Sequence, residues 1–164
     1  MGKSISALEE LREKNKEIER LKNEALDLAN EAFEQFSKGI FERYDRIESF
    51  AWNQYTPYFN DGESCVFSAN TDYIKINEEY AQDCEWFSEK NILSYGTFDR
   101  ESKTYVGRIE EENKLYDPEL CAAAMEIQQF LGSMTDDFFI KRFGDHSEIT
   151  VTRQGVEVDE YDHD

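Results

Sequence analysis

The chain has 164 residues, of which 34% are charged, 39% hydrophobic and 14% aromatic. A single domain of this length buries a substantial core, and this share of aromatic residues excludes a wholly disordered chain. The net charge of −19 argues against direct binding to nucleic acid or to an anionic membrane, since both are negatively charged.

The negative charge lies mainly beyond residue 48. Residues 1–48 contain nine Lys or Arg and twelve Asp or Glu, a net charge of −3, whereas residues 49–164 contain nine and twenty-five, a net charge of −16. We therefore expect a helical arm at 1–48, a compact acidic body at 49–158 and an acidic tail at 159–164. Such a body attracts basic protein surfaces, although acidity also serves solubility alone.

The sequence of the arm predicts one long helix or two helices in series. Apolar residues recur there in two registers of a seven-residue repeat, at Leu11, Ile18, Leu21, Ala25, Leu28 and Ala32. This spacing is typical of the a and d positions of a coiled coil, although Lys14 and Gln35 interrupt it. Bulkier residues follow from Phe33 to Ile47, so we expect coiled-coil character to end near residue 32 and the remainder to dock on the body. Because an amphipathic helix has to bury its stripe, we expect a homodimer through the arm, or else packing on its own body.

An aromatic run from Phe50 to Phe67 surrounds Asn60-Asp61-Gly62, which is a strong turn signal. Extended residues 55–59 are expected before the turn and a half-buried strand, 65–69, after it. The rings are interpreted as core, with a recognition surface as the alternative. Further strands are predicted at 72–77, 92–98 and 104–109, while 78–90 could form a helix.

The C-terminal part predicts two helices and a hairpin. Asp117-Pro118 opens a helix that ends at Gly132, and residues 135–143 form a shorter one stopped by Gly144. The tail after the hairpin is expected to fray. The strands of this hairpin are predicted at 148–151 and 156–158.

Taken together, the elements predict an α+β fold. It consists of a long N-terminal helical arm followed by a small antiparallel sheet packed with two or three helices. The N-terminus is a charged helix rather than a signal peptide, and no window approaches the roughly 20 apolar residues of a membrane helix. We therefore expect a cytoplasmic protein without membrane contact.

No motif in the chain indicates catalysis, a metal or a cofactor. Glycine-rich phosphate loops, the zinc-protease motif and calcium loops are absent from the sequence. The three cysteines lack the spacing of metal ligands. Asp145-His146-Ser147 are neighbours in the chain and cannot adopt the geometry of a catalytic triad. We therefore expect no cofactor, no metal and no enzymatic activity.

The segment Trp52-Asn-Gln-Tyr-Thr-Pro-Tyr-Phe-Asn-Asp-Gly-Glu-Ser-Cys65 resembles a run shared by small uncharacterised proteins of bacteriophages and bacteria. It covers less than a fifth of the chain and carries no known activity, so it assigns no functional residue. The resemblance implies a phage or bacterial cytoplasm, where small acidic phage proteins are often inhibitors of host defence or of host enzymes.

These observations favour a non-enzymatic acidic binding protein, namely a phage-encoded inhibitor or regulator of a host defence protein. It would act through its acidic surface as a nucleic-acid mimic, on a host protein with a basic surface. The acidic side chains predicted to contact this partner are Glu110, Glu111, Glu112, Asp136 and Asp137.

The alternative is a protein that binds and sequesters a small ligand such as a nucleotide signal. Three rings would stack on a base and three cations would hold the phosphate: Trp52, Tyr55, Tyr58, Arg100, Lys103 and Arg108. Residues 50–74 contain neither Lys nor Arg, which argues against stacking on a nucleic-acid strand. A phage assembly component that multimerises through the arm is a third hypothesis, and a metal-dependent enzyme is a fourth.

Overall fold

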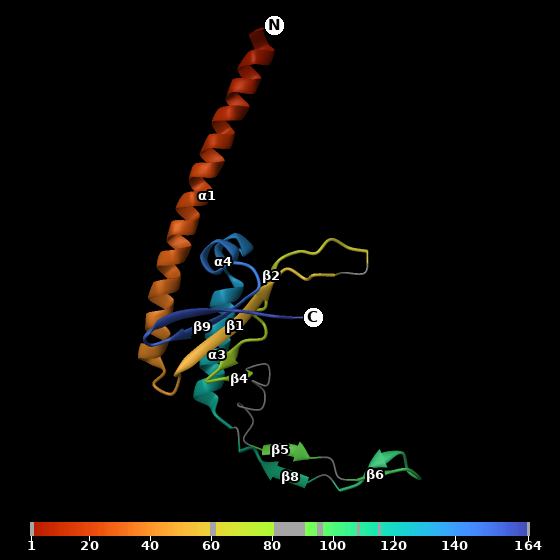
Figure 1. Ribbon diagram of the computed structural model, residues 1–164. Coiled ribbons are helices and arrows are strands. Elements are labelled where there is room, and N and C mark those ends of the chain that lie inside the picture. The colour runs from red at the N-terminus through yellow and green to blue at the C-terminus, as the bar shows by residue number, and fades with distance from the viewer. Residues whose placement is uncertain are drawn as a thin grey trace.

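A computed structural model describes residues 2–59, 62–80, 91–94, 97–107, 109–114 and 116–163. It has the predicted α+β fold: a long N-terminal helix, then a small antiparallel sheet with further helices (Figure 1). The upper part of the N-terminal helix projects from the body, and its lower part lies along it.

The arm forms one continuous helix, α1, Gly2–Arg43. Its lower part contributes Phe33, Ile40 and Phe41 to the core, as the change to bulky residues predicted. The last carbonyl groups of a helix have no partner within it. Here the Arg153 guanidinium, at the tip of the C-terminal hairpin, donates to backbone oxygens at and just beyond the helix end: those of Phe41, Tyr44, Asp45 and Ile47.

The main sheet is antiparallel, with strand order β10-β9-β1-β3-β4 and with β2 also paired to β1. Its central strand β1 pairs with β9 over six residues, from Ser49 opposite Thr152 to Gln54 opposite Ser147. The C-terminal hairpin of β9 and β10 therefore forms one edge, as expected. The strands are β1 Ser49–Tyr55, β2 Ser68–Ala69, β3 Lys75–Ile76, β4 Glu79–Tyr80, β9 Ser147–Thr152 and β10 Gly155–Glu160.

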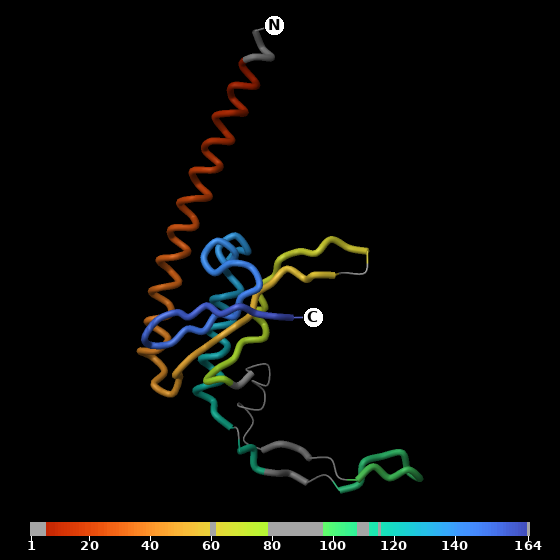
Figure 2. Tube along the Cα trace, viewed as in Figure 1, coloured from red at the N-terminus to blue at the C-terminus, as the bar shows by residue number. Residues whose placement is uncertain are grey.

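The aromatic run folds differently from the prediction. The strand lies at Ser49–Tyr55 rather than at 55–59, because β9 pairs with the residues before the proline. Residues 56–59 and 62–67 instead project from the body, and the return strand is only Ser68–Ala69. Figure 2 shows this projecting loop in yellow. Asn60 and Asp61 of the expected turn lie outside the described residues, and so does most of the possible helix at 78–90.

Two small hairpin-like sheets extend the chain away from the body (Figure 1). They occupy the regions in which strands were expected at 92–98 and 104–109. Each is antiparallel and two-stranded among the residues that the structure describes. The strands are β5 Asn91–Ser94 with β8 Ile109–Glu112, and β6 Phe98–Asp99 with β7 Thr104–Tyr105.

The two predicted C-terminal helices are present, and the second begins one residue later than predicted. In α3, Pro118–Gly132, the Asp117 carboxylate accepts a hydrogen bond from the Leu120 amide and caps the helix. In α4, Asp136–Phe143, Thr135 is the N-cap, and Gly144 ends the helix at a φ of 85°. That backbone conformation favours glycine.

Trp52 lies at the centre of the core. Its side chain is 1% exposed, and its ring is 6.2 Å from that of Phe33 on α1 and 5.4 Å from that of Phe143 on α4. Edge-to-face pairs of this kind stabilise cores beyond the area that they bury. The expectation that the aromatic run is core therefore holds for Phe50 and Trp52, but Phe59 is 79% exposed.

Gln54 is a fully buried polar side chain beside this core. Its Nε2 donates to the carbonyl oxygens of Phe139, at 3.1 Å, and Gly144, at 2.6 Å. Its Oε1 accepts a hydrogen bond from the indole N–H of Trp52 at 3.2 Å. One side chain thus joins the sheet to α4 and to the turn that follows it.

We predict that Gln54→Met lowers the free energy of unfolding by about 2–4 kcal/mol, because it removes the buried hydrogen bonds that Gln54 makes to the Trp52 indole N–H and to two backbone carbonyls. Chemical denaturation measures this loss. Gln128→Met is the matched control, since Gln128 makes one hydrogen bond, to the Asp72 carbonyl, near the surface. The control should cost about 0.5 kcal/mol or less, and equal losses for the two variants would contradict the assigned role.

Candidate functional site

One face of the main sheet is left open by the helices of the described chain. Along β9, Ile149 and Val151 point into the core, whereas Glu148 and Thr150 alternate to the other side. In Figure 1 this second side faces the viewer, and α3 lies behind the sheet. We call it the open face and define it by Ser49, Ala51, Asn53, Glu148, Thr150, Thr152, Glu157 and Asp159.

The middle of the open face is hollow because its side chains are small. Ser49, Ala51, Thr150 and Thr152 line a depression of about 450 Å³. Its other lining residues are longer and mostly acidic: Lys75, Glu78, Glu148 and Glu157. The face therefore combines a concave centre with an acidic border.

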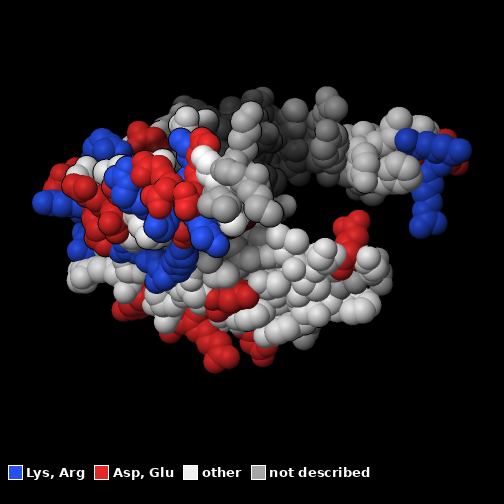
Figure 3. Space-filling model, turned by 90° about the horizontal axis from the view of Figure 1, so that it is seen from above, with Lys and Arg blue, Asp and Glu red and all other residues white. Residues whose placement is uncertain are grey.

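The acidic side chains of the open face oppose one another. Asp159 on β10 lies directly opposite Glu148 on β9, and Glu157 follows two residues away on the same side. Like charges placed opposite across two strands are destabilising. Lys75 pairs with Glu148 at 3.2 Å, whereas Glu157 and Asp159 have no ion pair within the described part of the chain. In Figure 3, seen from above, carboxylates gather along the lower rim, which corresponds to the front of Figure 1.

An aromatic group closes one end of the open face. We call Tyr55, Tyr58, His146, Tyr161 and His163 the histidine–tyrosine cluster. The Tyr58 ring stacks on both imidazoles, at 4.7 Å from His146 and 4.6 Å from His163. Tyr55 lies 3.9 Å from His163, and the Tyr161 amide donates to the His146 carbonyl. The tail was expected to fray, yet β10 continues to Glu160 and the chain stays packed through His163.

The two histidines of the chain contact each other. Nδ1 of His146 and Nε2 of His163 are 3.0 Å apart, which is a hydrogen-bond distance. One nitrogen must donate and the other accept, so the bond requires that at least one imidazole be neutral. His146 lies in the turn before β9 and His163 in the tail. Tyr58, which stacks on both imidazoles, holds the projecting loop against them.

Asp145 ties the base of the projecting loop to the same turn. Its carboxylate accepts hydrogen bonds from the amide and hydroxyl of Thr56, both at 2.7 Å, and from the His146 amide. Burial raises the pKa of Asp145, but these hydrogen bonds outweigh it, and the pKa lies below its ordinary value of 3.8. The contacts therefore stabilise the fold above that value and are lost as the pH falls through the folded pKa.

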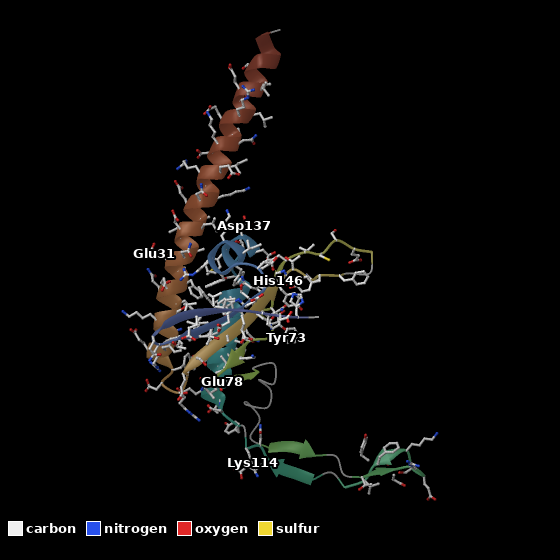
Figure 4. All side chains as sticks on the ribbon, in the orientation of Figure 1. Glu31, Tyr73, Glu78, Lys114, Asp137 and His146 are labelled. Atoms are coloured by element: carbon white, nitrogen blue, oxygen red, sulfur yellow. The ribbon has the colours of Figure 1, made fainter. Side chains whose placement is uncertain are left out.

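The acidic residues predicted to bind a partner fall at two separate places. Asp136 and Asp137 form the first turn of α4 and are exposed (Figure 4). Glu112 is exposed on β8, and the side chains of Glu110 and Glu111 lie outside the described ones. Figure 1 shows α4 and β8 at opposite ends of the body, so these acids do not form one patch.

The residues predicted to bind a small ligand are also separated. Trp52 is buried and cannot reach a ligand, Tyr55 is half-buried, and Tyr58 is exposed at the open face. Arg100 and Lys103 are exposed in the distant β6–β7 hairpin (Figure 1), and Arg108 lies outside the described residues. The rings and the two described cations therefore do not make a joint site.

Sequence reasoning missed the acids of the C-terminal hairpin and the pairing of the histidines. The hairpin itself was predicted, and its alternation of Ile149 and Val151 with Glu148 already placed acids on one side. That signal was sufficient to find the open face. The histidine pair had no such signal, because residues 146 and 163 meet only through the β9–β10 hairpin.

No family model, curated protein or solved structure matches this chain. Among the described side chains, no three of His, Cys, Asp or Glu are grouped so as to hold a metal ion. Within the same described residues, no helix is both long and apolar enough to cross a membrane.

We predict that His163→Ala releases Tyr58 from the cluster, because it removes one of the two imidazoles on which the Tyr58 ring stacks. Nuclear magnetic resonance of the Tyr58 ring would follow the release. Phenylalanine keeps a stacking ring, so His163→Phe should hold Tyr58 in place. Equal release of Tyr58 in the two variants would show that ring stacking is not the cause.

Proposed function

We propose that this protein is a non-enzymatic binding protein whose open face docks on a basic, nucleic-acid-binding surface of another protein, as a nucleic-acid mimic. The observation that carries the proposal is the opposed Glu148 and Asp159, next to Glu157, on a sheet face that the described helices leave uncovered. In the isolated chain this arrangement costs stability. Lysine and arginine side chains of a partner relieve the repulsion and supply the missing counter-charges.

The projecting loop adds apolar contacts next to these charges. Tyr58 is 65% exposed and Phe59 is 79% exposed, and such rings are enriched among the residues that contribute most to binding. One face of Tyr58 rests on the histidines, while the side chain stays open to solvent. An arginine of the partner can stack on that ring by a cation–π interaction and reach the acids beyond it.

The resemblance of residues 52–65 to phage and bacterial proteins supports a biological setting for this activity. The partner would then be a host protein, including a defence protein, that the chain inhibits or regulates in the cytoplasm. Sequestering a nucleotide receives less support, because Arg100 and Lys103 lie far from Tyr58. The partner is therefore described by its chemistry, as a protein with a cationic surface shaped for nucleic acid.

The test is capture of host-extract proteins on the immobilised chain, combined with competition by duplex DNA. We expect retained proteins to be basic nucleic-acid binders, to be displaced by the duplex, and to elute when salt rises from about 0.1 M to about 0.5 M. Both effects follow if the partner uses one cationic surface for DNA and for the open face. Retention that neither salt nor duplex DNA reverses would contradict mimicry.

A pair of variants with equal charge change locates the surface. Glu157→Gln with Asp159→Asn removes two charges from the open face, and Asp136→Asn with Asp137→Asn removes two from α4. We expect the first pair to weaken binding to a captured partner by roughly tenfold and the second by less than about twofold. Equal losses would show that net charge alone attracts the partner, and a larger loss from the α4 pair would move the site there.

A further inference from the structure

The large residues of the arm's apolar stripe are exposed. Ile18 is 48% exposed, Leu21 50% and Leu28 66%. The upper part of α1 projects with no described element beside it (Figure 1). We call Leu11, Ile18, Leu21, Ala25, Leu28 and Ala32 the seam. Each of these residues occupies an a or d position of the seven-residue repeat.

The seam is distinct from the side of α1 that packs on the body. Leu26, Ala29, Phe33 and Ile40 contact the core, and with 3.6 residues per turn their side of the helix lies roughly a quarter turn from the seam. Leu28 stays exposed although its neighbours Leu26 and Ala29 are packed. The chain's own body therefore leaves the large seam residues uncovered, although Ala25 borders the turn between α3 and α4 and Ala32 is half-buried.

The charged residues on either side of the seam indicate which partner it binds and in which orientation. The positions on one flank of the repeat are all glutamate: Glu10, Glu17, Glu24 and Glu31. In an antiparallel pair of arms these glutamates would face one another and repel. In a parallel pair in register they face the other flank, which carries Asn15, Lys22 and Ala29, and Glu17 of one copy meets Lys22 of the other.

We propose that the seam binds a second copy of this chain, as a parallel two-stranded coiled coil over roughly three heptads. The interface is weak, because Ala25 and Ala32 fill little space and Lys14 has to extend its ammonium group out of the seam. Because the interface is weak, we expect the fraction of dimer to change with protein concentration in the micromolar range.

The parallel arrangement has a geometric consequence for the bodies. Each body lies beside its own arm on the flank that contains Ala29, and a two-fold axis along the seam puts the two bodies on opposite sides of the paired arms. Both lie at the same end of the coiled coil. The dimer then presents two open faces, which is a bivalent arrangement that strengthens binding to a partner with two matching surfaces.

Sedimentation of the full chain over about 1–100 µM tests the pairing, a range that brackets weak association. We expect a monomer–dimer equilibrium in the unmodified chain and at least a tenfold larger dissociation constant for Ile18→Asp, which buries a charge in the seam. Asn23→Asp adds the same charge on the opposite side of α1 and should leave the constant unchanged. A monomer at every concentration, or equal effects of both substitutions, would overturn the proposal.

Charge exchange tests the orientation. If the arms are parallel, Glu17→Lys weakens the dimer roughly two- to tenfold and Lys22→Glu added to it restores the affinity. If the arms are antiparallel, Glu17→Lys removes a repulsion and strengthens the dimer, which overturns the parallel arrangement. Glu17→Lys also breaks the pair of Glu17 with Arg20 within the same helix. Glu13→Lys breaks the comparable pair of Glu13 with Lys16, away from the seam, and controls for helix stability.

Discussion

The packing of Trp52 against α1 and α4 is the contact on which the rest of the structure depends. Its ring contacts those of Phe33 and Phe143, and its N–H is bonded to Gln54, which in turn holds the end of α4. This one residue of the central strand thereby fixes a helix from each end of the chain. Because these helices cover one side of the sheet, the other side is left to solvent.

The open face follows from that asymmetry. An antiparallel sheet with helices on one side alternates apolar and polar residues along each strand, and here the polar side carries acids that oppose one another across β9 and β10. The histidine–tyrosine cluster closes the same face and fixes the base of the projecting loop. A hollow, a charged border and exposed rings thus meet on one surface, which is the combination expected of a docking site.

The arm and the open face are separate surfaces suited to two different partners. The arm is close to neutral and has a regular apolar seam, which suits a copy of itself. The open face is acidic, and two of its acids lack counter-ions among the described residues, which suits a basic partner. Since Leu26 and Ala29 hold α1 on the body while the seam points elsewhere, both surfaces can be occupied at once.

Local signals in the sequence determined the helices, the C-terminal hairpin and the α+β class. The caps at Asp117 and Thr135, the stop at Gly144 and the change from small to bulky residues near residue 32 act within a few positions of the chain, so they can be read without the fold. The tertiary structure alone decided the position of β1, because pairing with β9 over about 100 residues of separation draws residues 49–55 into the sheet ahead of the turn signal. It also decided which aromatic residues are buried and which acids lie together, since both depend on the side of the sheet that the helices cover. The same long-range pairing brings His146 to His163, a contact for which neither residue carries any local signal.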